Sequence, residues 1–255
     1  MSLWIKICAN TSLADAELAA EAGADAVGFV FAPSPRRVTA EQAATIVPHL
    51  PAALEKIGVF VDASFDEIAT TVKAAKLTGV QLHYEAPPAL AAQLRETFGP
   101  PLRILGVVHF YPQETAGKAS SVSGHDFSRA DAAEVRQGAL APEGCISDPN
   151  VNAILVDSRT ATAVGGTGQA FDWTAASKTL FQNETARARL IAAGGLTPEN
   201  VAEAIATLRP WGVDVVSGVE SAPGRKDAAK VHAFVAHARQ ASLRLLNALR
   251  ADTSA

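Results

Sequence analysis

The sequence contains little cysteine and no long apolar run. Its two cysteines, Cys8 and Cys145, could form at most one disulfide in 255 residues. No stretch is apolar over the roughly 20 residues that a transmembrane helix requires. The opening segment Met1–Lys6 also lacks the apolar core and cleavage site of a signal peptide. We therefore expect a cytoplasmic protein with free thiols and no membrane partner.

Several other functional signals are also missing. The formal net charge is -4 and the isoelectric point is near 5.9, and no stripe of lysine and arginine with interleaved aromatics runs along the chain. Nucleic acid is therefore not expected as a partner. The six histidines show no metal-ligand spacing. Gly165–Gly168 lacks the preceding strand and following acidic residue of a dinucleotide site, so we expect neither a metal nor a cofactor.

What the sequence does contain is a regular alternation of two kinds of segment. Hydrophobic residues make up 48% of the chain, enough to bury a large core. Short β-branched or aliphatic runs predict eight strands, at Trp4–Cys8, Ala26–Phe31, Lys56–Val61, Val80–His83, Arg103–Val108, Ala153–Asp157, Leu190–Ala193 and Val213–Ser217. Each run is apolar on both faces, which is typical of a parallel sheet.

Helical segments separate these strands. Helical composition or spacing marks Ala14–Ala22, Leu90–Phe98 and Val201–Leu208, and Asp227–Arg250 is expected to close the fold. Thr39 with Gln42, and Ser64 with Glu67, have the spacing of capping boxes at helix starts. Repeated strand-helix units in a chain of this length favour an α/β fold, a single-domain TIM (β/α)8 barrel over residues 1–255.

One interval departs from this repeat. Residues 111–149 are rich in Ser, Gly, Ala and Asp, and only Ser128–Gln137 has helical character. We interpret the interval as an extended insertion after the fifth strand that decorates the rim of the active site. His125 and Asp126 within it could touch substrate, although nothing in their spacing requires it.

Two glycine-containing segments near the end of the chain predict a phosphate site. Gly194 and Gly195 follow one apolar run, and Ser217 and Gly218 end the next. Glycine lets backbone N–H groups approach an anion, and a helix start after the loop adds favourable dipoles. Thr197 and Pro198 suit the N-cap and first position of that helix. The expected partner is a small phosphorylated molecule.

Reactive side chains fall at the carboxyl ends of predicted strands, which all face one mouth in such a barrel. Cys8, His83, Asp157 and Ser217 occupy such positions. A thiol and a carboxyl group there can act as an acid/base pair on a small substrate. Lys6 is expected inside the barrel, paired with an acidic residue such as Asp214, and a structural and a functional role are both open for it.

For Gln81 and His83, lining the site and making a structural hydrogen bond are both open, and Asp25 and Glu220 are interpreted as structural.

Taken together, these motifs resemble phosphoribosylanthranilate isomerase of tryptophan biosynthesis. The similarity runs through Lys6-Ile-Cys8, Ser34-Pro-Arg36, Val80-Gln-Leu-His83, Leu155-Val-Asp-Ser158, Gly165–Trp173, Ala193-Gly-Gly-Leu196 and Asp214–Glu220. The resemblance implies an eight-stranded barrel that catalyses an Amadori rearrangement of N-(5-phosphoribosyl)anthranilate without a cofactor. It also leaves open whether the chain is a monomer or a homodimer.

The resemblance implies roles for particular residues. Asp157 matches the general acid, which must be protonated at neutral pH, and Cys8 matches the general base. Arg36 matches the arginine that binds the anthranilate carboxylate. Gln81 and His83 are further candidates for substrate binding, and the phosphate-binding positions are Gly194, Gly195, Ser217 and Gly218.

The sequence departs from the family pattern at two places near the site. Ala9 stands where the family usually has glycine, and Tyr84-Glu85 stands where it usually has small and acidic residues. Two other functions stay open: isomerisation of another phosphoribosyl compound, as in histidine synthesis, and phosphate-ligand binding without turnover. The histidine-type chemistry is associated with an aspartate at the position of Cys8, and intact Cys8, Asp157 and Arg36 disfavour the non-catalytic alternative.

Overall fold

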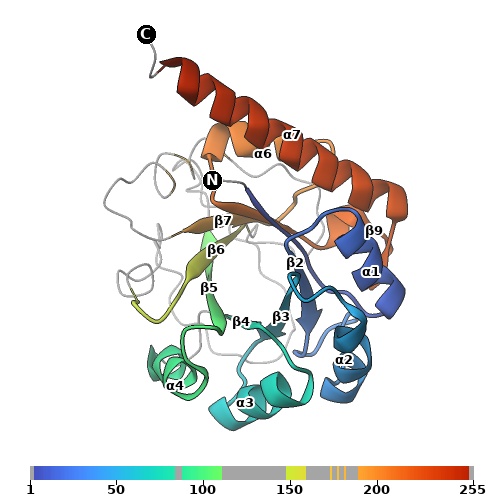
Figure 1. The fold of residues 1–255 in the computed structure, drawn as a ribbon, viewed down its shortest axis with the longest axis vertical. Coiled ribbons are helices and arrows are strands. Elements are labelled where there is room, and N and C mark those ends of the chain that lie inside the picture. The colour runs from blue at the N-terminus through green and yellow to red at the C-terminus, as the bar shows by residue number, and fades with distance from the viewer. Residues whose placement is uncertain are drawn as a thin grey trace, which may run out of the picture.

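Eight parallel strands form a closed barrel at the centre of the molecule (Figure 1). This computed structural model describes residues 3–83, 88–110, 148–158, 173, 177, 181 and 189–252. The strands follow one another around the barrel in chain order, and the last pairs with the first. They are β1 Trp4–Ile7, β2 Ala26–Val30, β3 Glu55–Phe60, β4 Gly79–Leu82, β5 Arg103–Phe110, β6 Ala153–Ser158, β7 Leu190–Ala193 and β8 Gly212–Val215.

Successive strand residues alternate between the barrel interior and the surrounding helices, as the two-residue period of a strand requires. In β1, Ile5 and Ile7 pack in the large cluster that contains helix residues such as Ala16 and Phe234. Trp4 instead packs in a cluster built almost wholly from strand residues, among them Ile57, Leu105, Leu155 and Ile191. Lys6 has the same parity as Trp4 and therefore points into the barrel.

Helices surround the barrel in Figure 1, with α7 lying across α6 and α1 and extending beyond the strands toward the C-terminus. Both predicted capping boxes are present, at the starts of α2 and α3. The helices are α1 Leu13–Glu21, α2 Ala40–Ile46, α3 Phe65–Ala74, α4 Pro88–Phe98, α6 Val201–Leu208 and α7 Ala228–Asp252, with short 3-10 turns η1 Val47–His49 and η3 Ser217–Val219. A small antiparallel pair, β9 Glu220–Ala222 and β10 Arg225–Lys226, follows η3.

The predicted barrel is confirmed, and each predicted strand is observed with ends that differ by at most two residues. The helix predicted from its apolar spacing, Val201–Leu208, is confirmed as α6, whereas the helix start predicted at Pro198 was wrong, since α6 begins after Asn200. Thr197 begins a turn instead, because its carbonyl oxygen accepts from the N–H groups of Asn200 and Val201 at 3.3 and 3.1 Å. The turn occupies residues 198–200, and the regular helix begins only after it.

Some sequence predictions lie outside the described residues. They include the interval 111–149 except its last two residues, with His125, Asp126 and the helix Ser128–Gln137, as well as Cys145, Tyr84-Glu85 and Gly165–Gly168. Within the described segments, no helix combines the length and the apolar character needed to cross a membrane.

Candidate active site

Cys8 follows directly after the last residue of β1, at the carboxyl end of the barrel strands. Its backbone N–H donates to the carbonyl oxygen of Val215 in β8 at 2.9 Å, so it remains tied to the neighbouring strand. Two residues later, Asn10 donates from its side chain to the carbonyl oxygens of Ile7 and Gly28, at 2.8 and 3.2 Å. These bonds fix the backbone that carries the thiol.

The thiol of Cys8 is free and lies in a buried position next to Gly28 of β2. A methyl group added at Gly28 would collide with the Cys8 Sγ and would approach the Lys6 Cε to 3.0 Å. Glycine in β2 thus provides the space that the thiol fills. Burial raises the pKa of the Cys8 thiol, while the positive charge of Lys6 acts in the opposite direction.

Lys6 lies one layer below Cys8 in the barrel and is fully buried. Its ammonium donates to Gln81 Oε1 of β4 at 2.7 Å and to Asp214 Oδ1 of β8 at 3.1 Å. The expected pairing of Lys6 with Asp214 is therefore present. Gln81 is also buried and makes a structural hydrogen bond inside the barrel, whereas its contact with substrate stays a prediction.

Asp157 and His83 stand at the same end of the barrel as Cys8. Asp157 is the fifth residue of β6, in register with His109 of β5 and Ala193 of β7, and it is partly buried. His83 follows β4, and its backbone N–H donates to the carbonyl oxygen of Phe60 at 3.2 Å. Parallel strands bring these side chains to one mouth although they are far apart in sequence.

The two predicted phosphate loops touch each other at this mouth. Gly194 and Gly195 follow β7 with φ of 83° and 65°, in the left-handed region that favours glycine. A methyl group at Gly218, in η3 after β8, would collide with the carbonyl oxygen of Leu196, so the two loops pack backbone against backbone. Beside Gly195, a methyl group would meet no atom within 4 Å, which leaves its α-carbon facing open space.

Arg36 lies in the loop after β2 and pairs with Glu220 of β9. Its Nε and Nη2 donate to the Glu220 carboxylate, with distances of 2.9 Å to Oε1 and 2.7 Å to Oε2. Lys226 of β10 contacts the same carboxylate, 3.4 Å from Oε1, and also donates to the carbonyl oxygen of Val216 at 3.3 Å. Glu220 thus joins Arg36 to Lys226, and Lys226 in turn contacts Val216, the residue just before the second predicted phosphate loop.

Comparison with known proteins shows which family has this sequence and fold. The family model described as N-(5'-phosphoribosyl)anthranilate (PRA) isomerase matches residues 5–104 and 105–237. The chain belongs to the phosphoribosylanthranilate isomerase family. N-(5'-phosphoribosyl)anthranilate isomerase of Geobacter sp. (strain M21) is 38% identical over 239 residues, covering 93% of this chain and 98% of the relative.

Solved structures of the phosphoribosylanthranilate isomerase family superpose on the chain. One, a complex with reduced 1-(o-carboxyphenylamino)-1-deoxyribulose 5-phosphate, has a TM-score of 0.69 at 31% identity and covers 93% of this chain and 99% of its own. Another, of monomers of the dimeric isomerase from Thermotoga maritima, has a TM-score of 0.69 at 30% identity with the same coverage. The family resemblance found in the sequence is confirmed.

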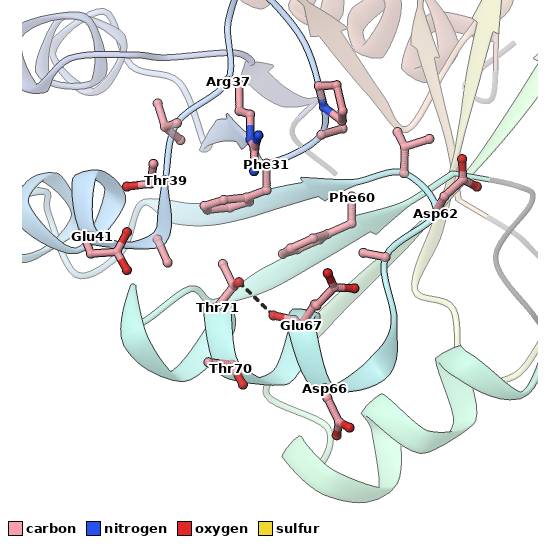
Figure 2. Close-up of a pocket in the computed structure, with 16 residues that line it drawn as sticks. Phe31, Arg37, Thr39, Glu41, Phe60, Asp62, Asp66, Glu67, Thr70 and Thr71 are labelled. Atoms are coloured by element: carbon pink, nitrogen blue, oxygen red, sulfur yellow. Dashed lines mark hydrogen bonds between the residues drawn. The ribbon is translucent and has the colours of Figure 1, made fainter.

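Within this isomerase family member, a separate pocket of about 710 Å³ lies between the loops that follow β2 and β3. Figure 2 shows Phe31 and Phe60 side by side in it, and their rings stack with centroids 5.1 Å apart. Thr71 and Glu67 of α3 and Glu41 of α2 form other parts of its wall. None of the predicted site residues lines this pocket, so it is not the predicted phosphoribosylanthranilate site.

Two features of this isomerase's site were not anticipated from sequence. Lys226 had no predicted role, and its two contacts depend on a hairpin that no strand pattern marks. Glu220 was interpreted as structural, and the structure makes it the partner of the predicted carboxylate-binding arginine.

Ala9 stands where the family usually has glycine. Its φ is 61°, the left-handed conformation to which glycine is suited.

Proposed function

We propose that the chain catalyses the Amadori rearrangement of N-(5-phosphoribosyl)anthranilate to the 1-deoxyribulose 5-phosphate, with Asp157 as general acid and Cys8 as general base. The observation that carries this is the convergence of four strand ends. Cys8 follows β1 and Asp157 ends the inward row of β6, while glycine loops follow β7 and β8 at the same mouth. A substrate anchored by its phosphate at these loops lies within reach of both groups.

The acid step begins the reaction. The Asp157 carboxyl group donates its proton to the ribose ring oxygen, the bond from C1 to that oxygen breaks, and the nitrogen lone pair forms an iminium at C1. Asp157 is then a carboxylate. Such general acid/base steps contribute roughly 10²–10⁴-fold each. The barrel position of Asp157, partly buried at the rim of β6, suits a group that must reach substrate and still hold a proton.

The base step follows at the neighbouring carbon. The Cys8 thiolate removes the proton from C2, the electrons of that bond form a C1–C2 double bond, and the iminium electrons return to nitrogen. The enolamine then becomes the ketone by moving the proton of its C2 hydroxyl to C1. Proton exchange with solvent returns Asp157 to its acid form and Cys8 to its thiolate, so atoms and charge balance over the whole cycle. The substrate itself accepts the electrons. Cys8, which is buried at the carboxyl end of β1, therefore has only to accept one proton.

Binding uses charge at both ends of the substrate. The backbone N–H groups around Gly194, Gly195, Ser217 and Gly218 hold the phosphate, helped by the start of η3. The guanidinium of Arg36 holds the anthranilate carboxylate through its Nη1 edge, because Nε and one N–H of Nη2 are donated to Glu220. His83 at the end of β4 lines the same mouth. We retain a cytoplasmic location, and a monomer or homodimer, as parts of this proposal.

The experiment follows the loss of anthranilate fluorescence when freshly formed phosphoribosylanthranilate is mixed with the purified protein in the presence of a chelator. The proposal is supported if fluorescence falls rapidly with the wild type and does not fall with Asp157→Asn or Cys8→Ala. The circular dichroism of both variants must match that of the wild type, which shows that they are folded. Near-normal turnover by Cys8→Ala would refute the base role. Loss with neither protein, together with turnover of a histidine-pathway phosphoribosyl substrate, would replace the proposed substrate.

A further inference from the structure

The interior of the barrel beneath Cys8 holds a buried lysine that the proposed mechanism does not use. Lys6 is 0% exposed, and its stem runs from β1 across the barrel to Gln81 on β4. Asp214, paired with Lys6 in the β1–β8 register, accepts a second hydrogen bond from the ammonium at 3.1 Å. Two acceptors on different strands therefore fix the charged end of Lys6 in one place.

The geometry brings this ammonium next to the thiol. Lys6 and Cys8 are two residues apart on one strand, so their side chains project to the same side. Both converge on the space beside Gly28, where an added methyl group would meet the Cys8 Sγ and the Lys6 Cε at once. Lys6 and Cys8 thus share the cavity that the missing Gly28 side chain leaves.

The charges around Cys8 come from several elements. Lys6 on β1 and Asp214 on β8 lie beneath it, Lys226 on β10 is a further cation, and Arg36 after β2 also interacts with the thiolate. Burial raises the pKa of the thiol and Asp214 adds to the rise, whereas Lys6 provides the largest opposing effect and Lys226 a smaller one. Burial opposes a charge on Lys6, but Asp214 and the thiolate outweigh it and raise the pKa of the ammonium.

We propose that Lys6 is a positioning residue for proton abstraction: its ammonium, held by Gln81 and Asp214, faces the Cys8 thiol and stabilises the thiolate form. Asp214 has two opposite effects in this arrangement, since it fixes Lys6 in place and also repels the thiolate. The inference rests on the base role of Cys8 in the proposed function. Lys6 itself exchanges no proton with the substrate.

The test compares two variants that differ only at position 6, where one keeps the charged lysine and the other has a neutral methionine. One is Asp214→Asn, and the other is Lys6→Met/Asp214→Asn, in which neither buried charge is left without its partner. The Cys8 thiolate is titrated by its ultraviolet absorbance, with the Cys8→Ser form of each variant as the blank. We expect the titration midpoint of the double variant to lie higher than that of Asp214→Asn by roughly 1–3 pH units. Equal midpoints would overturn the proposal.

A purely structural role for Lys6 makes a different prediction. If Lys6 only balances the charge of Asp214, the neutral double variant regains wild-type turnover and a wild-type titration midpoint. If Lys6 stabilises the thiolate, the acidic limb of the profile of kcat/KM against pH moves upward together with the titration midpoint. Lys6→Arg, which keeps the positive charge, should leave the acidic limb and the titration midpoint close to their wild-type positions.

Two further outcomes keep the inference separable from the proposed function. Turnover by Cys8→Ala would reject the base role, whatever the titrations give. An inactive Cys8→Ala combined with an unmoved titration midpoint would reject the role of Lys6 alone. If Lys6→Met/Asp214→Asn fails to fold, Lys6→Gln/Asp214→Asn retains a hydrogen-bonding side chain of similar length, and the same comparison with Asp214→Asn applies.

Discussion

Arg36 and Glu220 are joined by a two-pronged ion pair between the loop after β2 and the hairpin after β8. The Arg36 Nη2 lies 2.7 Å from Oε2, and Nε lies 2.9 Å from Oε1. The Glu220 side chain is only 4% exposed, so the contact holds the guanidinium against the barrel instead of leaving it to move in solvent. The pair fixes the orientation of the residue that we propose binds the substrate carboxylate.

We expect Glu220→Gln to weaken substrate binding by raising KM, because Arg36 then loses the charged partner that orients it. The size should approach that of Arg36→Met, with kcat changed less than KM. Steady-state kinetics on the two variants measures this. Glu55→Gln is the matched control, since it removes a carboxylate paired with Arg103 at the start of β3, the opposite end of the barrel, and should leave KM unchanged. An unchanged KM in Glu220→Gln would contradict the positioning role.

Glu220 should also make stability depend on pH. Burial opposes the charged form of Glu220, but hydrogen bonds from Arg36 and the charges of Lys226 and Arg36 outweigh it and lower its pKa. The stabilisation is therefore complete above the unfolded-state value of about 4.3 and is lost as pH falls through the lower folded-state pKa. Urea unfolding should show the advantage of wild type over Glu220→Gln shrinking only below about pH 4. A constant difference across that range would show that the carboxylate charge contributes nothing.

Ala9→Gly should stabilise the protein. Ala9 has a φ of 61° and is 1% exposed, and a left-handed conformation is strained for a residue with a β-carbon. Relief of this strain, less the greater unfolded-state freedom of glycine, should raise the free energy of unfolding by ~0.5–1 kcal/mol.

Denaturant unfolding measures the effect of Ala9→Gly. Ala43→Gly, in the interior of α2 where the backbone is helical, is the control and should destabilise by about 1 kcal/mol. Destabilisation by both substitutions to the same extent would mean that the Ala9 methyl group is worth more than the strain.

Gly218→Ala should impair binding of the phosphorylated substrate. Its methyl group would collide with the carbonyl oxygen of Leu196, so the two loops that we propose bind phosphate must separate. Displacing a binding group by about 1 Å can cost roughly 100-fold in rate, and we expect a loss in kcat/KM of that order. Gly99→Ala is the control, because alanine at its φ of 71° would strain the backbone at the end of α4, away from the loops. It should lower stability without raising KM. Normal kinetics in Gly218→Ala would separate this glycine from phosphate binding.

Much of the fold was predictable because the relevant signals are local. Apolar runs such as Ala26–Val30 and Leu190–Ala193 are buried on both sides in the sheet, and that burial is what makes them readable as strands. Ser64 and Glu67 form their capping box within four residues, without help from distant parts of the chain. The start of α6 was less predictable, because a turn and a helix make similar local hydrogen bonds from Thr197.

In the candidate site, too, some contacts were predictable from local signals and others were not. Its row of strand-end residues, and the Lys6–Asp214 pair, follow from strand parity and the closure of a barrel, so counting along the chain was enough. The partner of Arg36 was not predictable, because Glu220 reaches it only through a hairpin whose bend depends on Gly224 at φ 79°. The sequence alone determined which side chains stand at the barrel mouth, because strand period and connectivity are local properties. Only the tertiary structure decided that Gln81 also accepts a hydrogen bond from Lys6 and that Glu220 holds Arg36, because the first contact needs the closed barrel and the second needs the bent hairpin.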